Sequence, residues 1–282
     1  MEGGPRAGWA KEVAMPAELL VGYILLGGLV GFLAGLLGVG GGLTLVPVLT
    51  FLFARQAFPA DHVVHIAVAT ATATMMFTSV SSAREHHRHG AVLWPVVVAM
   101  APGIILASIA GPQIVRGFST AAFAGFFGVF VAVAATQILL DRKPAATRQL
   151  PGKIALGGVG AGIGLVSSMV GAGGAFLSVP FMVWCNVRLH NAVPTAAALG
   201  LPIAFAGTVG FALAGYHAEG MPPYSFGYIY LPALGAIVIG SVLAAPIGAR
   251  LTHRWPVRFL RRAFACLLYV LAGSMIWKAL RS

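Results

Sequence analysis

Residues 38–47 read G-V-G-G-G-L-T-L-V-P and interrupt an apolar run that extends from residue 19 to residue 53. That run is longer than one ordinary membrane span of about 20 residues, and consecutive glycines weaken a helix at its middle. A similar stretch, G-A-G-G-A-F-L-S-V-P, occupies residues 171–180 inside a second apolar run. Two broken helices at matching places in two halves of an apolar chain indicate a transport site.

The composition indicates a polytopic membrane protein. Of the 282 residues, 59% are hydrophobic and only 9% are charged, with a mean hydropathy of +0.90. A soluble domain carries about 25% charged residues. The net charge of +11 comes from basic residues scattered between apolar segments. They form no long soluble patch, so we expect no nucleic-acid partner. Arg and Lys in loops instead set the orientation in the bilayer.

The similarity between the halves continues beyond the glycines. The pattern H-x-A-V-x-T-A-x-A that begins at His65 returns at His190. Small residues at a spacing of four recur in both apolar runs, at Gly27, Gly31 and Gly35 and at Gly160, Gly164 and Ser168. For these small residues we favour close helix packing over a binding role. An internal duplication therefore predicts a tail, a first transmembrane repeat, a basic linker and a second repeat, at residues 1–18, 19–140, 141–153 and 154–282.

The basic residues bear on the relative orientation of the repeats. If each broken run lies within a single span, the 18 Lys and Arg residues divide almost evenly between the two sides. If each run is a hairpin that returns to its own side, twelve of the 18 share one face, which would be cytoplasmic. We therefore predict an all-α polytopic membrane protein of two inverted repeats. Each repeat is a glycine-broken hairpin plus three spanning helices, with about eight to ten hydrophobic segments in all.

The glycine breaks have the chemistry of an anion site. We expect each short arm to begin near residue 44 or 177, with Pro47 or Pro180 in its first turn. Such a helix start offers unpaired N–H groups and a positive dipole end to an anion. The candidate residues are Gly38, Gly40, Gly41, Gly42 and Thr44, with Gly171, Gly173, Gly174 and Ser178. The alternative is that these glycines only let helices cross closely.

Polar residues within the following spans supply further candidates. Thr70 and Thr74 share one helix face, and Thr195 is the counterpart of Thr70. These hydroxyls either line the route of the substrate or form hydrogen bonds between helices. His65 and His190 occupy matching positions near the start of their spans. They act either as protonatable gates or as caps at the membrane interface.

Several classes of function are disfavoured. All seven Asp and Glu residues are expected in tails or loops, whereas cation sites and proton relays place carboxylates inside spans. The spans contain no Ser/His or metal-ligand constellation, so we expect no enzyme, no catalytic residue, no metal and no cofactor. These absences favour a substrate that is anionic or neutral.

The chain resembles the TauE/SafE family of sulfite and organosulfonate exporters. The resemblance rests on G-L-L-G-V-G-G-G-L-T-L-V-P at 35–47, A-V-A-T-A-T-A at 67–73, the H-x-R-x-G loop at 86–90 and the second glycine stretch. The second repeat departs from the first at Pro194, where the first has Ala69, and at 197–200. The two halves are therefore not chemically equivalent.

This resemblance implies a multi-pass secondary transporter of the bacterial inner membrane. It would export small sulfur-containing oxyanions by alternating access, with the anion and the lipid bilayer as partners. A passive anion channel, or a permease for another small organic anion, is the alternative. The sequence leaves open whether the protein is a homo-oligomer.

Overall fold

The computed structural model describes residues 16–37, 41–88, 90–140, 147–251 and 257–281, and this part of the chain is almost entirely helical. The helices are α1 (Ala17–Leu37), α2 (Gly42–Arg55), α3 (Val63–Arg88), α4 (Trp94–Val115), α5 (Thr120–Leu140), α6 (Lys153–Val170), α7 (Ala175–Trp184), α8 (Leu189–Ala214), α9 (Leu231–Leu251) and α10 (Val257–Arg281). Two short strands, β1 (Ser225–Phe226) and β2 (Ile229–Tyr230), pair antiparallel before α9. Seven of these helices are long and apolar enough to cross a membrane.

Two helix boundaries differ from those expected. Helix α3 continues to Arg88, so Glu85 lies in its last turn and not in a loop. Arg and Glu are good helix formers, so the helix continues after its apolar residues end. The apolar run that begins at Phe226 predicts a span from that residue, but Phe226 lies in β1 and α9 begins only at Leu231.

Both apolar runs are broken where the glycines predict. Gly171 and Gly174 have φ of +66° and +71°, a conformation that residues with a Cβ rarely adopt. Helices α2 and α7 have 14 and 10 residues and are too short to cross a hydrocarbon core of about 30 Å. They begin two residues earlier than predicted, so Pro47 and Pro180 lie in the second turn.

Glycines allow the outer helices to pack in parallel, backbone against backbone. Helix α1 lies along α9, where Gly27 and Gly31 contact the backbone of Ile237 and Ser241. Helix α6 lies along α4 in the same way, where Gly160 and Gly164 contact the backbone of Met100 and Ile104. The predicted packing role of these small residues is confirmed at these four positions. The surroundings of Gly35 are not among the described features.

Gly160→Ala is expected to destabilise the protein, whereas Gly158→Ala is not. A methyl group at Gly160 would collide with the Met100 carbonyl, but one at Gly158, on the same helix, would meet nothing within 4 Å. Overpacking costs about 1–3 kcal/mol, more than the helix propensity that Ala adds. Thermal unfolding of both variants in detergent would measure this difference. Equal melting temperatures would contradict the close α4–α6 packing.

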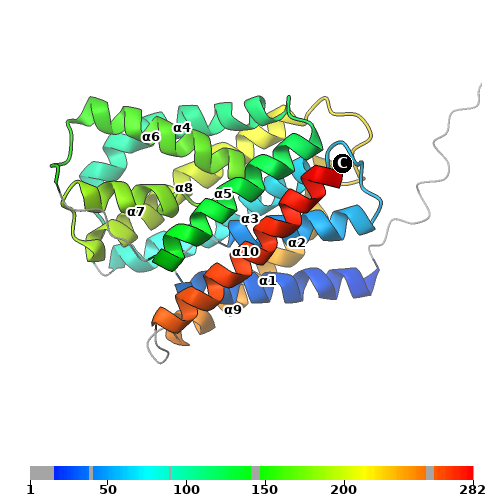
Figure 1. Ribbon diagram of the computed structural model, residues 1–282, viewed down its shortest axis with the longest axis horizontal. Coiled ribbons are helices and arrows are strands. Elements are labelled where there is room, and N and C mark those ends of the chain that lie inside the picture. The colour runs from blue at the N-terminus through cyan, green and yellow to red at the C-terminus, as the bar shows by residue number, and fades with distance from the viewer. Residues whose placement is uncertain (1–15, 38–40, 89, 141–146, 252–256, 282) are drawn as a thin grey trace, which may run out of the picture.

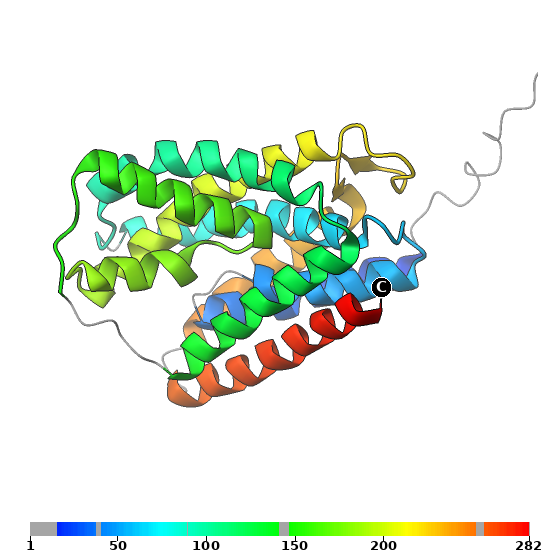
Figure 2. The same ribbon diagram turned by 45° about the horizontal axis from the view of Figure 1, so that its top comes forward.

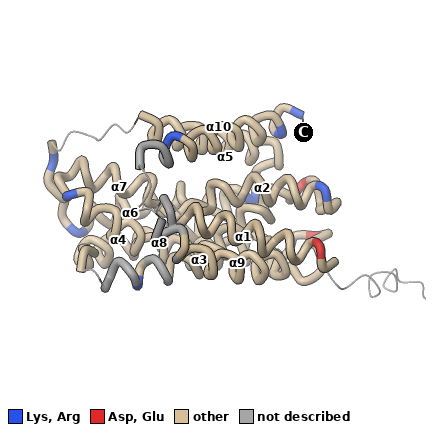
Figure 3. Tube along the Cα trace, turned by 90° about the horizontal axis from the view of Figure 1, so that it is seen from below, with Lys and Arg blue, Asp and Glu red and all other residues tan. Residues whose placement is uncertain are grey.

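The remaining long helices pair antiparallel. Helix α3 crosses α8, where Thr72 lies against Gly207 and Ser79 against Gly200. Helices α5 and α10 form a pair, tied by the Thr136 and Tyr269 hydroxyls at 2.7 Å. In Figure 1 this pair crosses in front of the other helices, and Figures 2 and 3 show it as a layer at one side of the molecule.

The helices end at two differently charged ends of the molecule. At the basic end, the guanidinium of Arg148 lies 5.0 Å from the ring centre of Trp184, and Asn191 donates to the Ala91 carbonyl. At the opposite end, Thr120 donates to the Asp61 carbonyl at 2.7 Å. Among the described side chains, the carboxylates Glu18, Asp61 and Glu219 all lie at this opposite end, together with several basic residues (Figure 3).

Candidate functional site

The two glycine breaks touch each other. Gly42, the first residue of α2, packs directly against the carbonyl oxygen of Gly171, which ends α6. A methyl group on Gly42 would overlap that oxygen, so the contact requires glycine. Both glycines are buried. The structure thus brings together two stretches that are far apart in the sequence and places them in the interior of the bundle.

Helix α2 begins at this contact, and α7 begins four residues after Gly171 along the chain. The N-cap residues are Gly41 and Gly174, and neither helix has a side-chain cap. The first N–H groups of a helix have no carbonyl ahead of them within the helix. Such N–H groups, together with the positive end of a helix dipole, are the general means by which a helix start stabilises negative charge.

The hydroxyls of the two first turns are directed at the helices themselves. Thr44 Oγ1 donates to the Gly41 carbonyl at 2.9 Å, and Ser178 Oγ donates to the Gly174 carbonyl at 2.9 Å. Both residues are buried. Each hydroxyl must rotate before it can donate to an anion.

Thr72 lies beside the contact, although sequence reasoning did not select it. A methyl group on Gly171 would lie 3.0 Å from Thr72 Oγ1, and the hydroxyl itself donates to the Val68 carbonyl. Thr72 is fully buried. The A-V-A-T-A-T-A motif contains this residue, but it lies on a different helix face from Thr70 and Thr74. Only the position of Gly171 shows which of these faces meets the break.

The hydroxyls of Thr70 and Thr195 accept hydrogen bonds from segments that lead into other helices. Thr70 Oγ1 accepts a hydrogen bond from the Tyr230 N–H just before α9, and Thr195 Oγ1 accepts one from the Leu93 N–H just before α4. Thr74, also buried, donates to the Thr70 carbonyl. The threonine face therefore points inward, and these contacts favour the hydrogen-bonding alternative for Thr70 and Thr195.

Thr70→Val is expected to lower stability, because it leaves the Tyr230 N–H without its acceptor. Such a loss costs about 1–3 kcal/mol when the group is buried. Thr208→Val is the matched control, since among the described residues the Thr208 hydroxyl bonds only to the Ala204 carbonyl of its own helix. Thermal unfolding compares the two. A melting temperature for Thr70→Val no lower than that of the control would show that the tie contributes nothing.

The two matching histidines have different surroundings. His65 is buried, and its Nε2 lies 2.9 Å from the Val115 carbonyl oxygen at the end of α4. A carbonyl only accepts, so Nε2 carries a hydrogen and caps that helix. His190 is exposed at the basic end. The ring centres of Tyr228 and His65 are 5.3 Å apart. Burial raises the pKa of the Tyr228 phenol.

The structure describes only some of the remaining glycine candidates of the two breaks. Gly41 and Gly173 flank the contact and are half-buried, while Gly38 and Gly40 lie outside the described residues. The described residues contain no group of three or more His, Cys, Asp or Glu side chains that could hold a metal ion. The described carboxylates Glu18, Asp61 and Glu219 lie together at one end of the molecule.

Comparison with known proteins assigns the chain to a family. The family model for the sulfite exporter TauE/SafE matches residues 23–275. This chain belongs to the TauE/SafE family. A "Probable membrane transporter protein" of Haemophilus influenzae is 34% identical over 258 residues, covering 90% of this chain and 97% of the relative. YdhB of Bacillus subtilis, also named a probable membrane transporter protein, is 25% identical over 83% of this chain and 91% of its own length. No solved structure matches this TauE/SafE chain.

Membership in the TauE/SafE family makes the chain a multi-pass membrane protein of a transporter family and not an enzyme family.

Proposed function

We propose that this TauE/SafE protein exports small sulfur-containing oxyanions, such as sulfite or organosulfonates, by alternating access around its two broken helices. One observation carries the proposal: the breaks meet at Gly42 and Gly171, deep in the bundle, with two uncapped helix starts beside them. Irregular backbone at membrane depth is tolerated where protein or a watery cavity covers it. Paired half-helices at such a place are typical of transporter sites.

The chemistry of the contact favours an anion as the substrate. Gly41, Gly42, Gly173 and Gly174 supply backbone at two positive helix ends, and no full charge is fixed there. An oxyanion has several acceptor atoms and can accept from both helices at once. The family description names sulfite, which is such an oxyanion. Thr44 and Ser178 add donors once their hydroxyls rotate.

Inverted repeats account for the directions of the helices. Counterparts in the two halves run oppositely: α3 is antiparallel to α8, and α5 is antiparallel to α10. The packing of α1 on α9 has its counterpart in the packing of α6 on α4. A two-fold axis in the membrane plane relates elements in this way. Each broken pair is then a hairpin that returns to the end from which it started.

The charge distribution sets the orientation that we propose in the bacterial inner membrane. With each broken run as a hairpin, twelve of the 18 Lys and Arg residues share the end that carries residues 147–153 and Arg188, and the positive-inside rule places that end in the cytoplasm. Residues 147–153 and Arg188 are then cytoplasmic, and the 215–230 loop and the C-terminus are outside. Reporter fusions after Arg148 and after Ser282 test this. Both reporters on the same side would contradict it.

The substrate is identified by uptake into proteoliposomes. Sulfite, sulfoacetate, taurine, thiosulfate and sulfate are compared at several pH values, with protein-free liposomes as the control. We expect saturable uptake of at least one sulfur oxyanion, and slower uptake of taurine, a zwitterion that carries no net charge. The absence of uptake for every anion would overturn the proposal.

A further inference from the structure

Two histidines and a tyrosine form a cluster at the end of the molecule opposite the basic end. The ring centres of His62 and His65 are 5.9 Å apart, and those of His62 and Tyr228 are 5.4 Å apart. The histidines come from the start of α3, and Tyr228 comes from the turn between β1 and β2. Figures 1 and 2 show the 215–230 segment, in yellow, at the same end as the blue connection between α2 and α3. Three titratable rings thus meet where two distant segments cross.

Two ring nitrogens of this cluster are buried without a partner. Nδ1 of His62 and Nδ1 of His65 are both buried and form no hydrogen bond within the described part of the chain. His65 itself is only 1% exposed. Because its Nε2–H donates to the Val115 carbonyl, Nδ1 of the neutral ring is an acceptor that lacks a donor. A buried acceptor of this kind costs stability and calls for a function or a missing solvent partner.

The surroundings of His65 keep its ring neutral in this arrangement. On the interior side, the Phe123 ring of α5 lies 4.8 Å from the His65 ring, centre to centre. The charged and titratable groups on the elements around it, apart from His62 and Tyr228, are exposed: Arg55 at the end of α2, Asp61, Arg116 after α4, and His217 and Glu219 on the 215–230 segment. A second proton, on Nδ1, would be a buried donor without an acceptor, which is costly.

The β1–β2 hairpin covers the histidines. Tyr228 is 2% exposed, and its N–H donates to the Phe211 carbonyl near the end of α8 at 3.5 Å. The Tyr230 N–H donates to Thr70 Oγ1 of α3 at 3.1 Å. Gly227, in the turn, packs against the backbone of Ala212. Because Tyr228 is the ring that the hairpin adds to the cluster, a movement of the hairpin uncovers His62 and His65.

Helix α3 connects this cluster to the paired breaks. Val68 and Thr72 follow His65 by three and seven residues, so the three side chains lie on one helix face. Val68 and Thr72 are the α3 residues that lie against Gly171. Seven residues of helix span about 10 Å. A displacement at His65 therefore reaches the second break through two turns of one helix.

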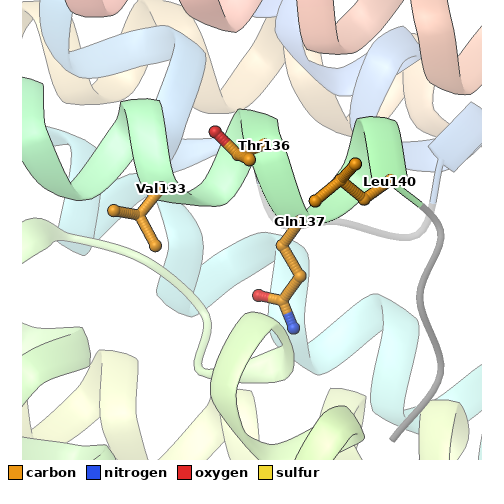
Figure 4. Close-up of a pocket in the computed structure, with 4 residues that line it drawn as sticks. All are labelled: Val133, Thr136, Gln137 and Leu140. Atoms are coloured by element: carbon orange, nitrogen blue, oxygen red, sulfur yellow. The ribbon is translucent and has the colours of Figure 1, made fainter.

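The hollow along α5 is not an alternative place for a proton. It has a volume of about 360 Å³ and is lined by Val133, Thr136, Gln137 and Leu140 (Figure 4). None of these side chains titrates in the physiological range. Val133 and Leu140 are more than half exposed. The buried histidine cluster is the place where a proton changes the charge of the interior.

We propose that the cluster of His62, His65 and Tyr228 is a proton-binding site. His65 takes up a proton from water at Nδ1 when the hairpin lifts, and the charged ring then holds this end of the molecule open. The open form binds one proton more than the closed form, so acid favours the open form. For one proton, the ratio of open to closed molecules changes by up to tenfold per pH unit. The proton site does not depend on the anion, but its coupling to export rests on the proposed function.

Hydrogen–deuterium exchange tests the proton site without any substrate. The rate for a peptide that covers residues 225–230 is divided by the intrinsic chemical rate at each pH, which gives the population of the open hairpin. From pH 8 to pH 5.5 we expect this population to rise at least tenfold in the unmodified chain. A population that does not change with pH would overturn the proposal, whatever any variant does.

Two glutamine variants assign the effect to one histidine. His65→Gln keeps an amide N–H for the Val115 carbonyl and cannot take up a proton, so we expect its hairpin opening to be independent of pH. His190→Gln, at the matching exposed position of the second repeat, is the control and should behave like the unmodified chain. An equal rise in His65→Gln and in the unmodified chain would show that His65 is not the proton acceptor.

Transport tests the coupling separately. With sulfite as the probe, we expect uptake by the unmodified protein in proteoliposomes to depend on pH and this dependence to be lost in His65→Gln. The same pH dependence in both would leave no role for the cluster in transport and would overturn the coupling. If exchange responds to pH as expected but no sulfur oxyanion is transported, the proposed function fails and the proton site stands.

Discussion

Gly42→Ala is expected to reduce anion transport more than tenfold while leaving the protein folded in the membrane. Gly42 is the first helical residue of α2, and Ala is a better helix former than Gly there. The only cost is the added methyl group, which overlaps the Gly171 carbonyl oxygen. Relief of that overlap requires the two breaks to separate, and the helix N-termini then no longer converge on one ligand.

The control for Gly42→Ala is Gly162→Ala. Gly162 lies on α6, and a methyl group there would meet nothing within 4 Å. Initial rates of sulfite uptake, normalised to the amount of folded protein by size-exclusion chromatography, compare both variants with the unmodified chain. Uptake by Gly42→Ala at the rate of the control would show that the contact between the breaks is not part of the transport site.

Ser178→Asp is expected to abolish anion transport, whereas Ser178→Asn retains part of it. The two side chains have nearly the same shape, so they differ chiefly in charge. A carboxylate in the first turn of α7 occupies the positive helix end, where it stabilises the helix by about 0.3–1 kcal/mol. It thereby replaces the anion and repels a second one. The neutral amide leaves the electrostatic attraction intact.

The same uptake assay measures both Ser178 variants, together with the equivalent pair Thr44→Asp and Thr44→Asn. Because Thr44 and Ser178 make matching hydrogen bonds to Gly41 and Gly174, we expect the same order in both helices. Equal transport by the Asp and Asn variants in both helices would mean that these N-termini do not attract the substrate.

The sequence predicts the helices well because their causes are local. Apolar runs, glycine breaks and the spacing of Gly27 and Gly31 are properties of neighbouring residues, and each has its counterpart in the fold. Helix ends are less well predicted. Propensity extends α3 to Arg88, and the short helices begin as soon as the glycines end, which moves Pro47 from the first turn to the second.

The site was predicted only in part, because its geometry depends on contacts between distant segments. The breaks were expected to form one site, but only the packing of the bundle makes Gly42 and Gly171 touch. Threonine hydroxyls in helices often bond to a carbonyl one turn earlier, so a polar face need not line a path. Thr70 accepts from Tyr230 instead, and Thr72 lies beside the site. The pattern shared by His65 and His190 cannot show that only one of them is buried.

The central claim is that the paired breaks form a site that opens to one side of the membrane at a time. Counterflow of labelled sulfite tests this most directly. Proteoliposomes are loaded with unlabelled sulfite and diluted into a trace of labelled anion. We expect transient, saturable accumulation of label above equilibrium, and we expect it to be lost in Gly42→Ala. Flux that is linear in concentration, shows no accumulation and is unchanged in Gly42→Ala would contradict it and would favour a passive channel.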